Sequence, residues 1–389
     1  MRSSLLCALF ALLVSPSAYT QNLNIPLSMG GPEAWLVTYS PGEVYWQRFG
    51  HNAIWLRDPS RGIDHVFNSG FFDFKQENFF SRFVQGRMLY FSNAQPVEQE
   101  FRQYQLENRG ILVQKLDLDF MQYERLAAYL LQQVQLESRD YLYDYYLDNC
   151  STRMRDALDV ALDGRLRPVL SQQAAGQNFR AHTRRSVALD FWYYLALESV
   201  LALPVDRAIS RWDEMFLPAV VSQVAREFKL DDKALVSAEH TVFTGGSFQA
   251  PVKPPQVWWH YLGAGTLLML FFGILGRFAG PVMSRGSVNA WLMIAGGSGC
   301  LLLYLWLLTN HQAAGPNINV LLMNPLFLLG LWRPLRSFAA ILLAGGLVLA
   351  VIQALVPAGQ FNLDVLSFVF PLNAACAYWL WQRSNTGTG

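Results

Sequence analysis

The stretch Tyr141–Leu162, YLYDYYLDNCSTRMRDALDVAL, decides how the first half of this chain is interpreted. Its first six residues are aromatic and extended in character, and apolar residues recur at helical spacing after Arg153. Asn149 is a good N-cap residue, so we expect a helix that begins at Cys150. The free N–H groups and the dipole of a first helical turn favour a thiolate. The pattern therefore predicts a reactive cysteine.

Cys150 is the only one of the four cysteines that we expect in an exported soluble domain. Cys7 lies in an N-terminal export signal, which we expect to end near residue 21. Cys300 and Cys376 lie in apolar segments of membrane-span length. A lone thiol in an oxidising compartment has no intramolecular partner, which favours a functional cysteine. The alternative is a buried, inert cysteine that only packs.

A cysteine nucleophile needs a base, and His51 is the main candidate. It follows Gly50 at the start of a predicted short strand, and Arg61-Gly62 marks a turn into a second strand. A histidine on a central strand facing a cysteine at a helix start is the arrangement of papain-like enzymes, here in permuted order. His65 is a weaker candidate, and a histidine with only a structural role is the alternative.

The second half of the chain is apolar and almost free of charge. From Val257 onwards it holds one acidic residue, Asp364, no lysine and five arginines. Four segments are long and apolar enough for helical spans: Val257–Gly276, Ala290–Thr309, Phe338–Val356 and Leu363–Trp381. A fifth, Ile318–Trp332, reaches only about 22 Å at the rise of an α-helix, so it is either a tilted span or a re-entrant segment.

The arginines decide between these two possibilities. Only a fifth crossing places all of them on the cytoplasmic side, as the positive-inside rule expects. We therefore predict about five transmembrane helices. The expected organisation is a signal peptide in residues 1–21, a periplasmic catalytic domain in 22–244, a linker in 245–256 and a transmembrane domain in 257–389.

Several blocks of sequence resemble one known family. They are Gly50-His51-Asn52-Ala53, Val66–Phe74, Asn108-Arg109-Gly110, Asp148–Arg153 and, in the membrane half, Asn324-Pro325. Together they resemble the Lnb-type lipoprotein N-acyltransferases, over roughly residues 32–380. The resemblance implies an α+β papain-like periplasmic domain, permuted, with an antiparallel sheet and helices. An all-α bundle of about five transmembrane helices would follow it.

The resemblance also implies a function at the bacterial inner membrane, with the catalytic domain in the periplasm. Cys150 and His51 match the nucleophile and the base of the family. Cys150 would take a fatty acyl group from a membrane phospholipid as a thioester and pass it to the free amine of a lipoprotein. No cofactor is implied, and neither is a metal.

The third, orienting residue is less well defined. Asn68 fits the block of the family best, followed by Asp64 and then His65. The chain departs from the family at Asn52, where a small residue is more common, and at Ser69-Gly70, where Tyr-Gly is more common. These departures leave the identity of the substrate open.

Two other functions are compatible with the sequence. A peptidoglycan peptidase or amidase uses the same cysteine–histidine pair, and fold alone does not separate it from an acyltransferase. A non-enzymatic membrane scaffold would need only a packed Cys150. The net charge of +1 and the lack of a basic run argue against nucleic-acid binding. Metal-ligand spacings of the C-x-x-C or H-E-x-x-H type do not occur, which argues against a zinc site.

Overall fold

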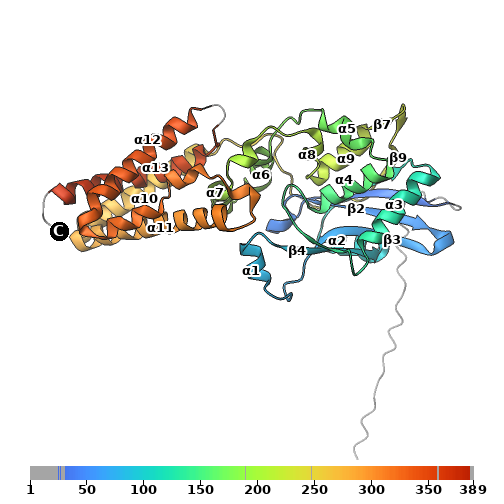
Figure 1. The fold of residues 1–389 in the computed structure, drawn as a ribbon, viewed down its shortest axis with the longest axis horizontal. Coiled ribbons are helices and arrows are strands. Elements are labelled where there is room, and N and C mark those ends of the chain that lie inside the picture. The colour runs from blue at the N-terminus through green and yellow to red at the C-terminus, as the bar shows by residue number, and fades with distance from the viewer. Residues whose placement is uncertain are drawn as a thin grey trace, which may run out of the picture.

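The computed structural model describes residues 25, 27, 31–188, 190–246, 248–356 and 359–385. A sheet domain comes first and a helical bundle second, and the two lie end to end along the long axis of the molecule (Figure 1). The export signal predicted for residues 1–21 lies outside the described residues.

The sheet domain is built on one antiparallel sheet of seven strands, in the order β6-β4-β3-β2-β1-β5-β9. These strands are β1 (Glu33–Tyr39), β2 (His51–Asp58), β3 (Ile63–Phe71), β4 (Leu89–Pro96), β5 (Ile111–Leu116), β6 (Asp140–Leu142) and β9 (Val236–Phe243). A separate hairpin pairs β7 (Lys229–Leu230) with β8 (Lys233–Ala234). Side chains alternate between the two faces of a strand, and in β1 and β2 both sets are apolar and buried. Both faces of the sheet must therefore be covered.

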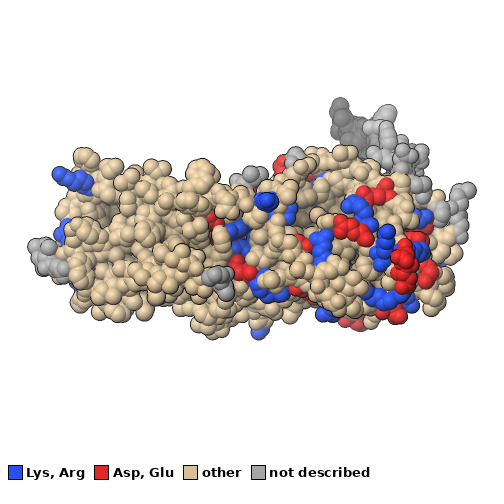
Figure 2. Space-filling model, turned by 90° about the horizontal axis from the view of Figure 1, so that it is seen from above, with Lys and Arg blue, Asp and Glu red and all other residues tan. Residues whose placement is uncertain are grey.

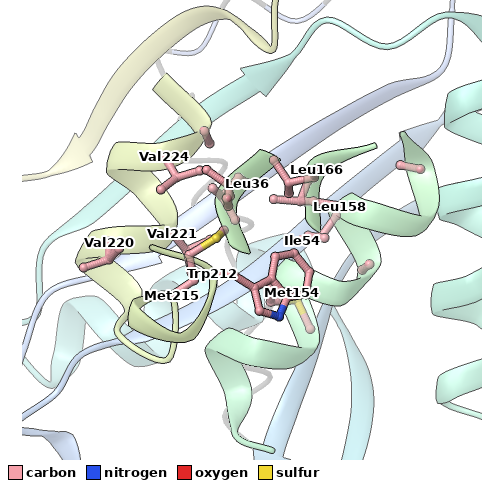
Figure 3. Packing of buried hydrophobic residues seen from close by; sticks show 14 of the residues in the cluster. Leu36, Ile54, Met154, Leu158, Leu166, Trp212, Met215, Val220, Val221 and Val224 are labelled. Carbon is pink, nitrogen blue, oxygen red and sulfur yellow. The ribbon is translucent and has the colours of Figure 1, made fainter. Parts of the chain in front are cut away.

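Helices cover the sheet on its two faces. One face carries α3 (Phe120–Gln133), α4 (Cys150–Ala161) and α9 (Pro218–Glu227), and the other carries α2 (Val97–Leu106). Figure 3 shows Leu36 and Ile54 of the sheet packed among residues of α4 and α9. The remaining helices before the bundle are α1 (Phe79–Val84), α5 (Leu166–Ser171), α6 (Phe179–Val187), α7 (Phe191–Val200) and α8 (Arg211–Glu214). The predicted α+β fold with an antiparallel sheet is confirmed.

The bundle contains four helices that are long and apolar enough to cross a membrane. They are α10 (Trp258–Ala279), α11 (Pro281–Leu308), α12 (Arg336–Ala354) and α13 (Leu363–Asn385). Charged side chains gather on the sheet domain, whereas the visible surface of the bundle is almost free of charge except at its far end (Figure 2). This distribution fits a bundle whose sides face lipid.

The fifth predicted span is not an α-helix, so the expectation of about five transmembrane helices is corrected to four helices and one irregular crossing. Residues 318–331 form the 3-10 helices η5 (Ile318–Leu321) and η6 (Pro325–Leu331). Gly299 of α11 contacts the backbone of Met323, and Gly346 of α12 contacts that of Leu321. Pro325 has no N–H to donate, which disfavours an α-helix through this segment.

The irregular segment passes from one end of the bundle to the other. Its start lies near the sheet domain, because Asn317 Nδ2 donates to the carbonyl of Ser199 (2.9 Å). It ends at Arg333 and Arg336, which lie close to Arg285 and Arg383 at the opposite end. The arginines thus gather at one end of the bundle, as the positive-inside rule predicts.

A buried group of ion pairs joins the two domains. We call it the junction cluster: Arg180, Arg184, Glu198, Asp206 and Asp364. Arg184 of α6 pairs with Glu198 of α7 (2.7 Å) and with Asp364 of α13 (2.9 Å). Arg180 pairs with Glu198 (3.1 Å) and with Asp206 (2.6 Å). The single acidic residue of the membrane half is therefore the partner that ties α13 to the sheet domain.

Candidate active site

Cys150 is the first residue of α4, as the sequence predicts. The side-chain oxygen of Asn149 accepts hydrogen bonds from the N–H groups of Ser151 (2.9 Å) and Thr152 (3.0 Å). The Thr152 hydroxyl accepts one in return from the Asn149 N–H (2.7 Å), which completes a capping box. This cap fixes the point at which the helix begins, and it sets the sulfur at the positive end of the helix dipole.

The end of β3 lies directly against Cys150. Gly70 has a φ of +103°, and a Cβ atom built on it would lie 3.4 Å from the Cβ of Cys150. A residue other than glycine rarely adopts this backbone conformation. Gly70 therefore lets the strand that carries Asn68 approach the cysteine closely.

His51, the first residue of β2, lies between Asn68 and Cys150. Its Nε2 is 2.9 Å from Asn68 Oδ1, which accepts the hydrogen bond, while Cys150 lies close enough to raise the pKa of the ring. With Nε2–H directed at Asn68, the Nδ1 atom is left for the thiol. The ring also stacks with Tyr39 (5.9 Å between centroids) and Tyr104 (6.1 Å), which restricts its orientation.

The ionisation of Cys150 and His51 is linked. Burial acts to raise the pKa of the Cys150 thiol, but the charge and hydrogen bond of His51 and the backbone N–H of Asn52 outweigh it, so the pKa lies below its ordinary value. Burial acts to lower the pKa of His51, but the thiolate of Cys150 raises it above its ordinary value. Both shifts favour a thiolate–imidazolium pair, the reactive form of a catalytic cysteine.

The structure places the other two candidates for the orienting role away from His51. Asp64 Oδ1 accepts a hydrogen bond from Trp55 Nε1 (2.7 Å), and His65 Nδ1 accepts one from the Asp64 N–H (3.3 Å). Asp64 shares a strand face with Asn68, but it lies four residues nearer the β2–β3 turn, about 13 Å away along the strand. Asn68 is therefore the candidate that reaches the histidine.

Two buried charged residues lie behind the histidine: the sequence analysis missed Glu100, and it placed Arg109 in a block of the family without giving it a role. Glu100 of α2 is only 2% exposed; burial raises its pKa, and the nearby His51 opposes this effect. Arg109 is also buried and lies over the Tyr104 ring, 4.6 Å from its centroid. The available signal for Glu100 was a carboxylate on the apolar helical stripe that Val97 and Phe101 define.

Four tyrosines form an aromatic wall that extends from the cysteine towards the bundle. We define this wall as Tyr90, Tyr141, Tyr143 and Tyr145. Tyr143 is close enough for Cys150 to influence its pKa, which burial and the thiolate both raise. Tyr143 stacks on Tyr90 (4.3 Å), and Tyr145 stacks on His311 of the loop after α11 (6.3 Å). The wall gives the thiol apolar surroundings on the side that faces the bundle.

Within the described ranges, no group of three or more His, Cys, Asp or Glu side chains is arranged to hold a metal ion. Free thiols among the same residues are Cys150, Cys300 and Cys376, of which Cys150 alone lies in the sheet domain. The arrangement around Cys150 is thus a thiol, an imidazole and an amide, the three groups that a cysteine nucleophile with an oriented base would need.

Residues 32–188 match the family model described as the Lnb N-terminal periplasmic domain. The match begins just before β1 and ends after α6, so it includes His51, Asn68 and Cys150. No curated protein and no solved structure matches the chain.

Proposed function

We propose that this chain, whose residues 32–188 match the Lnb N-terminal periplasmic domain, is an Lnb-like membrane protein and a cysteine-dependent acyltransferase of the bacterial inner membrane. It moves a fatty acyl group from a membrane phospholipid to the terminal amine of a lipoprotein. The position of His51 between the Cys150 thiol and the Asn68 amide carries this proposal.

The first half of the reaction forms a thioester. His51 takes the proton of Cys150, and the thiolate attacks the ester carbonyl of the phospholipid. The bond between the acyl carbon and the lipid oxygen breaks, and the imidazolium returns its proton to that oxygen. The backbone N–H of Asn52 already donates towards the sulfur, so it is a ready donor beside the carbonyl oxygen as charge develops there.

The second half transfers the acyl group. The neutral amine of the lipoprotein attacks the thioester carbonyl, a carbon–nitrogen bond forms and the carbon–sulfur bond breaks. The amine proton passes to His51, and the thiolate is restored. Asn68 keeps the ring in one tautomer through both halves, because its oxygen accepts the Nε2 proton.

The aromatic wall and the bundle support a lipid substrate over a peptide from the cell wall. Tyrosines on the side of the thiol that faces the bundle suit an acyl chain, because aromatic surface is removed from water when the chain packs on it. A peptidase has no comparable use for a bundle with four membrane-length helices.

The test uses the full chain in phospholipid nanodiscs with a labelled acyl donor. We expect a labelled protein band that hydroxylamine removes, and its absence from Cys150→Ala and His51→Ala. Mass spectrometry of a diacylated lipoprotein added to the wild-type reaction should show one additional acyl chain on the terminal amine. Release of muropeptides from cell-wall material, without any labelled band, would favour the amidase instead.

A further inference from the structure

Two exposed apolar groups of the sheet domain lie beside the bundle. The first group, on α1, is Phe80, Phe83 and Val84, and the second is Tyr45, Trp46 and Trp192. We call the two groups together the aromatic rim. Phe80 is 75% exposed and Trp46 is 63% exposed, close to the 72% of Leu308 at the end of α11. Single exposed apolar residues are ordinary on a protein surface. Large aromatic side chains gathered beside a membrane-spanning bundle instead indicate a surface that contacts another apolar phase or molecule.

Helix α1 sits directly beyond the end of α11. The Asn310 N–H donates to the carbonyl of Gln85 (2.9 Å), and His311 Nε2–H donates to the carbonyl of Phe83 (3.0 Å). Gly86, with a φ of +67°, permits this approach, because a Cβ atom there would contact the backbone of Asn310 and His311. The exposed phenylalanines of α1 therefore stand at the level at which α11 leaves the membrane.

The second group of the rim lies at the same level on other helices. The Trp192 ring is 6.2 Å from that of Phe368 in α13, and Phe191 stacks on Tyr261 in the first turn of α10 (4.5 Å). The ring of Tyr45 packs on Tyr193 of α7 (4.6 Å). Helix α7 thus packs on the first part of α10 and of α13, and Tyr45 packs on α7 in turn.

We infer that the aromatic rim inserts into the interfacial region of the outer leaflet of the membrane in which the bundle sits. Aromatic rings concentrate at this depth, because it offers apolar contact beside polar headgroups. The rim adjoins the bundle, because the Phe83 carbonyl bonds His311 just after α11 and the Trp192 ring contacts Phe368 of α13. Phe191, the neighbour of Trp192, stacks on Tyr261 of α10. The apolar surface of the rim therefore continues the lipid-facing surface of the helices.

The insertion sets the position of the Cys150 thiol relative to the membrane surface. Strand β3 leads from Gly70, next to Cys150, to Phe72, which stacks on Phe79 of α1 (6.1 Å). With α1 held at the leaflet, Cys150 is held close to the phospholipid headgroups. This docking is a separate property from the chemistry proposed for Cys150, and its test does not depend on activity.

The experiment places a nitroxide label on single cysteines of the full chain in phospholipid nanodiscs. The native cysteines Cys7, Cys150, Cys300 and Cys376 are replaced by alanine, and the test positions are Phe80→Cys and Trp46→Cys. Leu308→Cys is the lipid-facing reference. Phe120→Cys on α3, at the end of the sheet domain away from the bundle (Figure 1), is the aqueous reference, with a native exposure of 63%. The measurement is the collision rate of each label with oxygen and with a water-soluble nickel chelate.

We expect positions 80 and 46 to follow position 308, with oxygen collisions dominant, and position 120 to show the reverse. Phe83→Cys, on the same helix, replaces Phe80→Cys if that chain does not fold. Nickel collisions at position 80 as frequent as those at position 120 would overturn the inference. Such a result would leave the acyl-transfer proposal standing, since that is decided by the thioester assay.

Discussion

The junction cluster and the Cys150 site both contain ionisable groups, but the two places differ in how completely these groups are paired. In the junction cluster each arginine contacts two carboxylates, and Tyr194 donates a further hydrogen bond to Asp364 (2.9 Å). At the site, the partly exposed Cys150 and His51 share one proton, and each shifts the pKa of the other. Full pairing fixes a geometry, whereas incomplete pairing leaves a group that can react.

This difference separates residues that stabilise the fold from residues that can react. Buried, multiply bonded charges resist rearrangement, because any movement exposes an unpaired charge to a medium of low dielectric constant. A thiol with a single proton partner remains free to exchange that partner for a substrate. Substitutions at the two places should therefore change different measured quantities, and the predictions below use that contrast.

The largest expected effect is that of Cys150→Ala on activity. Loss of the nucleophile should reduce thioester formation to background, a loss on the order of 10⁶-fold by comparison with other covalent catalysts. The melting temperature should change little, because Cys150 is only partly buried and alanine keeps its Cβ atom. Labelled acyl transfer and thermal unfolding of the same preparation measure the two quantities, and residual turnover with a normal melting temperature would refute the thioester route.

Arg184→Ala should have the largest effect on stability. It leaves Glu198 and Asp364 without their shared cation, and breaking a buried ion pair in this way costs about 3–5 kcal/mol of unfolding free energy. The matched control is Arg165→Ala, which removes an exposed pair with Asp231 and should cost about 0–1 kcal/mol. Unfolding of both variants in detergent gives the comparison, and equal losses would contradict it.

Asn68→Ala should have a smaller effect, confined to catalysis. Without the acceptor for Nε2–H, the ring of His51 loses its fixed tautomer but remains stacked on Tyr39 and Tyr104. We expect the turnover number to fall by less than the ~10²–10⁴-fold that a general base contributes. Asp64→Ala is the control, since its carboxylate bonds Trp55 instead, and it should leave turnover unchanged. Equal losses in the two variants would argue against the orienting role of Asn68.

The smallest effect is a change in the pH dependence of alkylation. For an ordinary thiol, with a pKa near 8.5, the fraction present as thiolate falls about fifty-fold between about pH 8.5 and pH 6.5. The pKa of Cys150 is lowered, so its thiolate persists to a lower pH than that of an ordinary thiol and disappears only as the pH falls through the lowered pKa. Iodoacetamide rates should therefore decline less steeply in the wild type than in His51→Ala. Parallel profiles would mean that His51 does not control the thiol.

The start of α4 and the position of β2 could be predicted from sequence because their signals are local. Asn149 before Cys150 is a helix cap, and the short apolar run Ala53–Leu56 after His51 marks a strand. The choice between Asn68 and Asp64 could not be made, because both lie on the same face of β3. Only the pairing of Ala53 with Asn68 settles which one reaches the histidine, and strand register is a tertiary property.

The irregular crossing shows the limit of a prediction from hydropathy. Composition marks Ile318–Leu331 as apolar, and the arginines indicate that it crosses, but neither reveals its backbone conformation. The structure divides the segment into two 3-10 helices, η5 and η6, which Leu322, Met323 and Asn324 separate, so the rise of one regular helix does not describe its length. The re-entrant alternative is contradicted instead by the two ends of the segment, which lie at opposite ends of the bundle.

The irregular crossing also sets the order in which the membrane half can mature. The carbonyl of Leu322 is bonded by Asn373 of α13 (2.9 Å), and the N–H of Ile318 by the side chain of Gln360 (2.8 Å). Both partners are synthesised after the segment that needs them. Because unsatisfied backbone groups are costly in lipid, the crossing can settle only when the last helix has entered the membrane. A chain that ends before α13 would therefore leave the Leu322 carbonyl without the Asn373 amide in the middle of the membrane half.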